Sequence, residues 1–509
     1  MPKPDVVLII LDTTRRDRLS IYGNKSNTSP HFDDFASRAT LYDRAVSPAQ
    51  WTIPAHASLF TGTYASTHQL IEADRTLSGA YPTLAEILRA DGYHTAGFCN
   101  NPLVGVLNNG LQRGFDAFYN YAGAAPNRPQ DMRRSGIRRM VERRWGRFAR
   151  NVGNKFAHSD ALFQISMHPL LVPIWTRSIN YTGHTAHSIS DSLEYLQTRR
   201  KTHPETSNFT FLNLMGAHLP YHPPPEFLPA EIRNDKAAWR FMRRFNTEAA
   251  RWATPDEPPL SDWQKHVIDG FYQAEIAHQD AHLGRLLRYL QTLDDTLVII
   301  AADHGEGHGD HGFFGHSFVV YQELVHVPLM IHYPERFPQG ARIAKNVSTR
   351  RIFHTIMDAT GITPPLDEAD PNADVAGLSL ARSLNGTADK DGEFVFAEAF
   401  PPQTVVNLIH KRTPELLERL QLRQTRRGVY AGEHKLALIG DSVDGLFDVS
   451  TDPAEMQNVA DNQPDTVRDL QATVAEFVKT AEHYRAGGLA YGTVSAEVED
   501  NLRALGYIE

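Results

Sequence analysis

The sequence predicts an α/β protein with a large mixed, mostly parallel sheet sandwiched by helices, followed by a smaller α+β subdomain with an antiparallel sheet. Two continuous apolar runs, residues 6–11 and 297–302, each end in a carboxylate, as buried parallel strands that deliver a ligand do. Strand-like and helix-like segments alternate through about residue 120, a pattern typical of a parallel sheet flanked by helices. Beyond about residue 390, short strand-like segments favour antiparallel pairing.

Sequence patterns along the chain predict the individual helices and strands. Residues 82–93 read as a helix that glycine closes before the next strand, and residues 209–215 form a further apolar strand. Residues 263–292 are expected to form one long helix. In the last part of the chain, residues 428–439 favour short strands and residues 465–484 a covering helix.

The length of 509 residues, with 41% apolar content, supports more than one domain. We expect a catalytic domain over residues 1–390 and a C-terminal subdomain over residues 391–509. The catalytic domain would carry a helical insertion at about 120–200. A proline-rich excursion at about 221–261 is expected to act as a lid, because such loops usually cover a site.

Composition narrows the class of protein. A net charge of −9 and a pI near 6.2 argue against a general nucleic-acid binder. One cysteine, Cys99, excludes an intrachain disulfide framework and agrees with a reducing compartment. The chain shows no leader pattern and no apolar run of membrane-spanning length, so a cytoplasmic location is expected.

Residues 131–155 form a candidate basic amphipathic helix, because arginines alternate there with large apolar side chains. A solvated helix or one that contacts another subunit of a homo-oligomer is favoured. The alternative is that this helix makes peripheral contact with a membrane surface.

Polar groups follow the two apolar runs. Asp12 ends the first run, and Asp303 and His304 end the second. Ligands of open α/β sheets bind beyond the carboxyl ends of the strands, so these side chains are expected to converge. Carboxylate and imidazole ligands together suit Zn²⁺ or Mn²⁺ better than Mg²⁺ or Ca²⁺.

The segment from Thr52 to Gly62 places a hydroxyl just before a proline-led turn and is interpreted as a nucleophile loop. Alone, such a threonine is more often a cap or turn residue. Its meaning therefore depends on the metal and acid groups elsewhere in the chain.

Taken in order, several motifs resemble those of the sulfatase branch of the alkaline phosphatase superfamily. They are the strand ending in Asp12, the Thr52 to Gly62 segment, and residues 93–98, 216–221, 303–306, 321–329 and 446–459. The nucleophile signature departs from the family: Thr52, Pro54 and His56 stand where sulfatases carry cysteine or serine, proline and arginine. Threonine cannot be oxidised to formylglycine, because its secondary alcohol would give a ketone.

A directly encoded threonine resembles instead the nucleophile of lipoteichoic acid synthases and phosphoethanolamine transferases, which implies phosphoryl transfer beside a single metal. The resemblance implies one divalent ion, with Mn²⁺ or Zn²⁺ favoured and Mg²⁺ or Ca²⁺ left open. The implied site residues are the metal ligands Asp12, Thr52, Asp303 and His304, the catalytic residues Thr52, His218 and His316, and the substrate-binding residues His56 and Asn100.

The expected function is that of a metal-dependent hydrolase or transferase acting on phosphodiesters or phosphomonoesters through a covalent threonine intermediate. The substrate would be an anionic ester, either a small molecule or a lipid headgroup. Two alternatives remain: a sulfuric ester hydrolase that uses unmodified Thr52, and a noncatalytic binding protein on a sulfatase fold.

Overall fold

An eight-stranded sheet forms the centre of the protein, in the order β11-β2-β10-β7-β1-β6-β4-β5. The computed structural model describes residues 3–121, 185–247, 260–367, 370–385, 394–485 and 490–491. The strands of the sheet are β1 (Asp5–Leu11), β2 (Thr40–Val46), β4 (His94–Cys99), β5 (Ala117–Asn120), β6 (Asn208–Leu214), β7 (Thr296–Ala301), β10 (His326–His332) and β11 (Arg342–Ser348).

Most neighbouring strands of this sheet run parallel. Strand β1 pairs in parallel with both β6 and β7, and β4 pairs in parallel with β5 and β6. Only β10 runs antiparallel to its neighbours β2 and β7. The predicted mixed, mostly parallel sheet is therefore confirmed.

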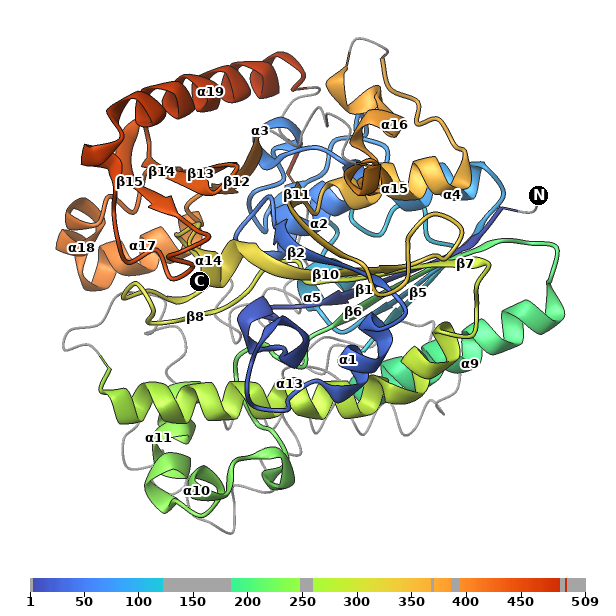
Figure 1. Ribbon diagram of the computed structural model, residues 1–509, viewed down its shortest axis with the longest axis horizontal. Coiled ribbons are helices and arrows are strands. Elements are labelled where there is room, and N and C mark those ends of the chain that lie inside the picture. The colour runs from blue at the N-terminus through green and yellow to red at the C-terminus, as the bar shows by residue number, and fades with distance from the viewer. Residues whose placement is uncertain are drawn as a thin grey trace.

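Helices cover both faces of the sheet (Figure 1). One face carries α1 (Pro30–Ala36), α9 (Thr185–Thr202) and the long α13 (Asp262–Leu290). The other carries α2 (Thr52–Thr61), α4 (Leu84–Ala90) and α15 (Arg351–Thr360), beside the short α3 (Ala65–His68), α5 (Pro102–Gly105) and α16 (Val375–Leu378). Helix α13 begins with a capping box, because Ser261 and Gln264 bond to each other's backbone N–H groups.

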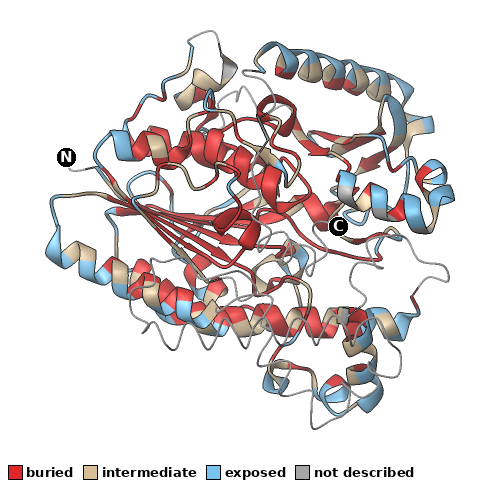
Figure 2. Cartoon of the chain, turned by 180° about the vertical axis from the view of Figure 1, so that it is seen from behind, coloured by how far each residue is buried: buried red, intermediate tan, exposed pale blue. Residues whose placement is uncertain are grey.

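The apolar core lies between these layers, and Figure 2 shows the central strands buried along their length. Every apolar residue of β1 and β7 is fully buried. Strands buried on both faces read as continuous apolar runs rather than alternating ones, which is why the sequence revealed them.

A second sheet is antiparallel, in the order β12-β13-β14-β15, and its position after residue 390 confirms the predicted antiparallel subdomain sheet. Its strands are β12 (Val395–Ala399), β13 (Arg426–Ala431), β14 (His434–Ile439) and β15 (Ser442–Asp448). The surrounding helices are α14 (Gln322–Val325), α17 (Gln403–Arg412), α18 (Pro414–Arg419) and α19 (Pro464–His483), of which α19 packs on the sheet. The boundary at residue 390 stays a prediction.

Two expectations need separate comment. The nucleophile segment is helical from Thr52 to Thr61 rather than a loop, and Gly62 closes it with a φ of 73°. Pro54 fits in the first turn, where backbone N–H groups have no intrahelical partner. The proposed basic helix at 131–155 and most of the insertion at 120–200 lie outside the described residues.

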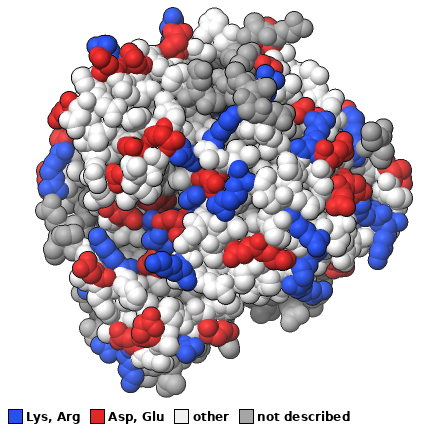
Figure 3. Space-filling model, in the orientation of Figure 1, with Lys and Arg blue, Asp and Glu red and all other residues white. Residues whose placement is uncertain are grey.

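The excursion at 221–261 contains η3 (Pro225–Phe227), α10 (Ala230–Arg233) and α11 (Lys236–Thr247) within its described part. No helix among the described residues is long and apolar enough to cross a bilayer. Figure 3 shows basic and acidic side chains interspersed over one face of the molecule, so neither sign dominates that face.

Candidate active site

The site forms where four parallel strands end. Asp12 directly follows β1, while Asp303 and His304 follow β7 within three residues. The turns after β4 and β6 reach the same edge, because these strands pair in parallel with each other and β6 pairs with β1. The predicted convergence of the two acidic strand ends is therefore present in the structure.

Asp12, Asp303 and His304 each offer one ligand atom to a common cluster, with these atoms within 4.8 Å of one another. His304 Nε2 lies 3.4 Å from Asp303 Oδ2 and 4.0 Å from Asp12 Oδ1. Thr52 Oγ1 lies 3.3 Å from the same nitrogen. All four side chains are fully buried. The four predicted metal ligands thus lie around one point.

The donor atoms suit a divalent cation. Asp12 Oδ1 and Asp303 Oδ2 are buried without a hydrogen-bond donor in the described structure, a costly arrangement for charged oxygens. Burial, followed by the Asp12 charge, raises the pKa of Asp303, so two ionised carboxylates side by side require a nearby positive charge.

The tautomer of His304 also fits metal binding. Its Nδ1 lies 2.8 Å from the Gly305 carbonyl oxygen, which can only accept a hydrogen bond. Nδ1 therefore carries the proton, and Nε2 keeps its lone pair toward the cluster. Burial lowers the pKa of His304 and favours the neutral ring that a metal needs.

Thr52 is presented by the first turn of α2, at the end of the helix where positive partial charge gathers. The Asn101 amide donates to Asp12 Oδ2 at 2.6 Å and reaches Thr52 Oγ1 at 3.4 Å. Asn101 Oδ1 meanwhile accepts from Leu103 N as the N-cap of α5, which fixes the direction of the amide. One asparagine therefore links the strand carboxylate to the hydroxyl.

His56 lies beneath Thr52 and is fully buried. Its Nδ1 donates to the Thr52 carbonyl oxygen at 2.9 Å, and its Nε2 lies 3.2 Å from the Asn213 amide nitrogen. The same amide donates to Asp12 Oδ2 at 3.1 Å. Burial lowers the pKa of His56, which is consistent with a neutral ring that supports the backbone of Thr52. Its predicted contact with substrate stays a prediction.

His218 and His316 lie beside the cluster, with ring centroids 5.3 Å apart. The His316 ring lies tilted against His304 with centroids 4.5 Å apart, and its Nδ1 lies 2.9 Å from Glu306 Oε1. Although burial opposes it, the Glu306 carboxylate raises the pKa of His316. Burial lowers the pKa of His218, whose Nδ1 contacts the Leu219 carbonyl. The environment therefore favours the protonated form of His316 and the neutral form of His218.

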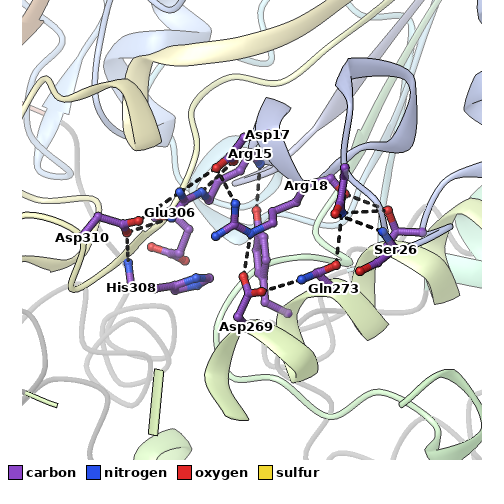
Figure 4. Close-up of polar contacts among 12 residues, drawn as sticks. Arg15, Asp17, Arg18, Ser26, Asp269, Gln273, Glu306, His308 and Asp310 are labelled. Carbon is purple, nitrogen blue, oxygen red and sulfur yellow. Dashed lines mark hydrogen bonds and ion pairs between the residues drawn. The ribbon is translucent and has the colours of Figure 1, made fainter. Parts of the chain in front are cut away.

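A buried guanidinium joins the two strand ends (Figure 4). Arg15 Nη1 donates to the Glu306 carbonyl at 3.2 Å and to Asp310 at 2.8 Å, while Nη2 donates to Asp17 at 2.9 Å. These carboxylates hold the pKa of Arg15 above its ordinary value in spite of burial. The contacts fix the loop after β1 against the loop after β7, and so hold the ligands of both strands in place.

The structure also distinguishes the roles of two neighbouring asparagines, Asn100 and Asn101, which the sequence alone does not. Asn100 is fully buried and accepts a hydrogen bond from Ser188 Oγ at 2.7 Å, whereas its neighbour Asn101 contacts the cluster. A substrate role for Asn100 stays a prediction. Three residues at the cluster, Asn101, Asn213 and Glu306, are not among the site residues that the sequence predicts. Pro102 marks Asn101 as a helix cap, and Asn213 is a polar residue within an apolar strand, so both left a signal.

Comparison with known proteins agrees with this architecture. The family model described as Sulfatase matches residues 4–362. An arylsulfatase of Clostridium perfringens (strain 13 / Type A) is 22% identical over 425 residues, covering 76% of this chain and 78% of the relative. An N-acetylglucosamine-6-O-sulfatase of Bacteroides thetaiotaomicron is 21% identical, covering 93% of this chain and 87% of the relative.

Solved structures show the same fold. A structure in complex with its substrate D-glucosamine-2-N,6-O-disulfate superposes with a TM-score of 0.66 at 16% identity, covering 94% of this chain and 98% of that chain. The phosphonate monoester hydrolase of Agrobacterium radiobacter superposes with a TM-score of 0.61 at 20% identity, covering 95% and 96%. The protein belongs to the sulfatase family, and its fold is that of the alkaline phosphatase superfamily.

Proposed function

We propose that the protein hydrolyses or transfers an anionic phosphate or phosphonate ester through a covalent intermediate on Thr52. The observation that carries the proposal is the position of Thr52 Oγ1, which lies 3.3 Å from His304 Nε2 and within reach of the Asn101 amide. An encoded threonine has no route to formylglycine, so the attacking atom is the hydroxyl itself. A divalent ion at Asp12, Asp303 and His304 would supply Lewis acidity and favour the alkoxide.

The side chains of this protein divide the remaining work. Asn101 and the first turn of α2 orient the Thr52 oxygen. As the bond between Thr52 oxygen and phosphorus forms, the bond to the ester oxygen breaks, and His316 donates a proton to the departing oxygen. His218 donates from Nδ1 to the Leu219 carbonyl, so its Nε2 is left as an acceptor that can orient the attacking water. Water or an acceptor alcohol then attacks phosphorus and gives its proton to the now neutral His316, while the bond from phosphorus to the Thr52 oxygen breaks and Thr52 is regenerated.

A sulfate ester is the second candidate substrate, because the relatives reported above include an arylsulfatase and an N-acetylglucosamine-6-O-sulfatase. The phosphonate monoester hydrolase with a similar fold supports the phosphoryl candidate. The two candidates share the metal site and Thr52, and differ in whether an ester of phosphorus or sulfur is turned over.

One experiment tests the proposal. Metal-stripped protein is supplied with Mn²⁺, Zn²⁺, Mg²⁺ or Ca²⁺ and assayed on aryl phosphate diesters, phosphate monoesters, phosphonate monoesters and sulfates. The isosteric variant Thr52→Val should lose turnover while Thr52→Ser retains it. Phosphoryl turnover that survives in Thr52→Val would overturn the nucleophile assignment. Turnover of sulfates alone would establish the second candidate. Absence of turnover on every ester, with metal bound, would favour a noncatalytic binding protein.

A further inference from the structure

Two histidines on the long helix α13 face each other outside the active site. His278 and His282 are four residues apart, so they lie one above the other on the same side of the helix. Their Nε2 atoms are 2.9 Å apart, and the ring centroids are 4.7 Å apart. Both residues are partly exposed. Two imidazole nitrogens therefore meet at a point that solvent can reach.

Both rings keep the chemistry of a metal ligand. Burial, followed by the neighbouring His282, lowers the pKa of His278 to about 4, and burial lowers the pKa of His282. Near neutral pH both rings are uncharged. The contact between them is then one N–H donated to one lone pair, and a change of tautomer frees both Nε2 atoms for a cation without release of a proton.

The backbone that carries the pair is held firmly from its buried side. Gln279 Oε1 accepts from Gly216 N at 2.7 Å. Asp280 accepts from the backbone N–H groups of His31 at 3.0 Å and Phe32 at 2.9 Å. These contacts fix the turn of α13 between the two histidines, so little backbone order has to be gained when a ligand binds.

The distance between the nitrogens suits coordination. With metal–nitrogen bonds of about 2.0–2.1 Å, nitrogens separated by 2.9 Å subtend an angle of about 90° at the ion, as in octahedral or square geometry. The same bonds at a tetrahedral angle need a separation of about 3.3–3.4 Å, which small rotations of the side chains supply. Both geometries are therefore within reach.

Two glutamate side chains lie near the pair, and burial raises the pKa of one of them, Glu275, to about 8. Glu275 Oε2 is 4.0 Å from His278 Nδ1, the nitrogen that would carry the proton when Nε2 binds a metal. The charge of Glu226 also acts on His278, and the Phe227 ring next to it packs against His278 with centroids 5.2 Å apart. Glu226 is exposed, and its charge would add electrostatic attraction for a cation held by this pair.

We propose that His278 and His282 form a peripheral site for a borderline divalent transition metal such as Ni²⁺, Zn²⁺ or Cu²⁺. Imidazole nitrogens select these ions over Mg²⁺ and Ca²⁺, which prefer oxygen ligands. Glu226 belongs to η3, in the excursion that follows His218. The site is independent of the reaction at Thr52.

The test is a calorimetric titration of the full chain with Ni²⁺, after its catalytic site has been saturated with metal. Wild type should take up one equivalent more than His278→Asn or His282→Asn. The matched control is His266→Asn, which removes an exposed single histidine from the same helix and should leave the uptake unchanged. Titration with Mg²⁺ should show no corresponding uptake. Circular dichroism and turnover before addition of Ni²⁺ confirm that each variant is folded.

A spectroscopic measurement identifies the ligands. Cu²⁺ bound to this site in wild type should show electron paramagnetic resonance couplings to two nitrogens, and the signal should be lost in His282→Asn. Equal Ni²⁺ uptake by wild type and both pair variants would overturn the proposal, as would equal loss in His266→Asn. Because the ligands at Thr52 are untouched in every variant, a failure here leaves the proposed ester chemistry standing.

Discussion

Replacing Lys435 with methionine should destabilise the protein measurably. Lys435 on β14 forms an ion pair with Glu455 after β15, and both side chains are fully buried. Lys435 Nζ also donates to the Val320 carbonyl, and Gln322 N donates to Glu455 Oε2 at 2.7 Å. The pair therefore attaches the C-terminal sheet to the segment that follows His316. Methionine keeps much of the length of lysine but removes its charge.

The size of the effect follows from burial. Removing one partner of a buried ion pair costs about 3–5 kcal/mol, because the other charge is left uncompensated. At roughly 2.1 cal/mol/K per residue, cooperative unfolding of 509 residues has an entropy of about 1.1 kcal/mol/K. Lys435→Met should therefore lower the melting temperature by about 3–5 °C.

Differential scanning calorimetry measures this change. The matched control is Lys479→Met, since the Lys479–Glu476 pair on α19 has side chains that are 80% and 69% exposed and should contribute almost nothing. The double variant Lys435→Met/Glu455→Gln should recover most of the loss, because neither charge of the buried pair remains. A Lys435→Met melting temperature equal to that of Lys479→Met would refute the reasoning, and so would a double variant that is less stable than the single one.

Three further outcomes are expected. Asn101→Ala should weaken metal affinity about 10–100-fold, measured by competition with a chelator, because the change removes a hydrogen bond to Asp12. Asn100→Ala should weaken metal affinity less, because the amide oxygen of Asn100 accepts from Ser188 rather than contacting Asp12. Metal at 100 times its dissociation constant should stabilise wild type by about 2.7 kcal/mol and leave the melting temperature of Asp303→Asn unchanged, since a ligand would be lost. Burial raises the pKa of Glu72 from 4.5 to about 7, so the contribution of its protonated form to stability is complete below pH 4.5 and is lost as pH rises through 7. Across this pH range, urea titrations should show that Glu72→Gln gains stability relative to wild type. Parallel stability profiles of the two proteins against pH would contradict the shift.

The sequence predicts the fold where burial leaves a simple pattern. Strands β1 and β7 are apolar on both faces, and a carboxylate follows each of them within two residues. The conformation of the segment from Thr52 was harder to predict, because a proline two residues later is compatible both with a turn and with the first turn of a helix. Only packing against the sheet distinguishes the two.

The site was predictable to the extent that its residues follow strands directly. Asp12 and Asp303 lie immediately beyond strand ends, so their convergence follows from parallel pairing. Asn100 and Asn101 differ by one position, and the cap that selects Asn101 depends on the direction of α5. Glu306 was missed because its role depends on His316, ten residues away across a turn whose course the sequence does not specify.

The charges of the site favour an ester that carries one negative charge. While Thr52 keeps its proton, Asp12, Asp303 and Glu306 would contribute three negative charges, and a divalent ion together with protonated His316 would contribute three positive ones. His56 stands where the sulfatase signature has arginine, and burial lowers the pKa of this histidine, so it adds no fixed positive charge to the cluster.

A monoanionic diester or phosphonate monoester then leaves one uncompensated charge in a buried site, whereas a dianionic phosphate monoester leaves two. We therefore expect a higher kcat/KM for an aryl phosphate diester than for the monoester of the same leaving group. The variant His316→Lys, which fixes the positive charge, serves as a comparison and should narrow that difference if it remains active. A monoester turned over faster than its diester by wild type would show that further cations reach the substrate and that this charge balance is incomplete.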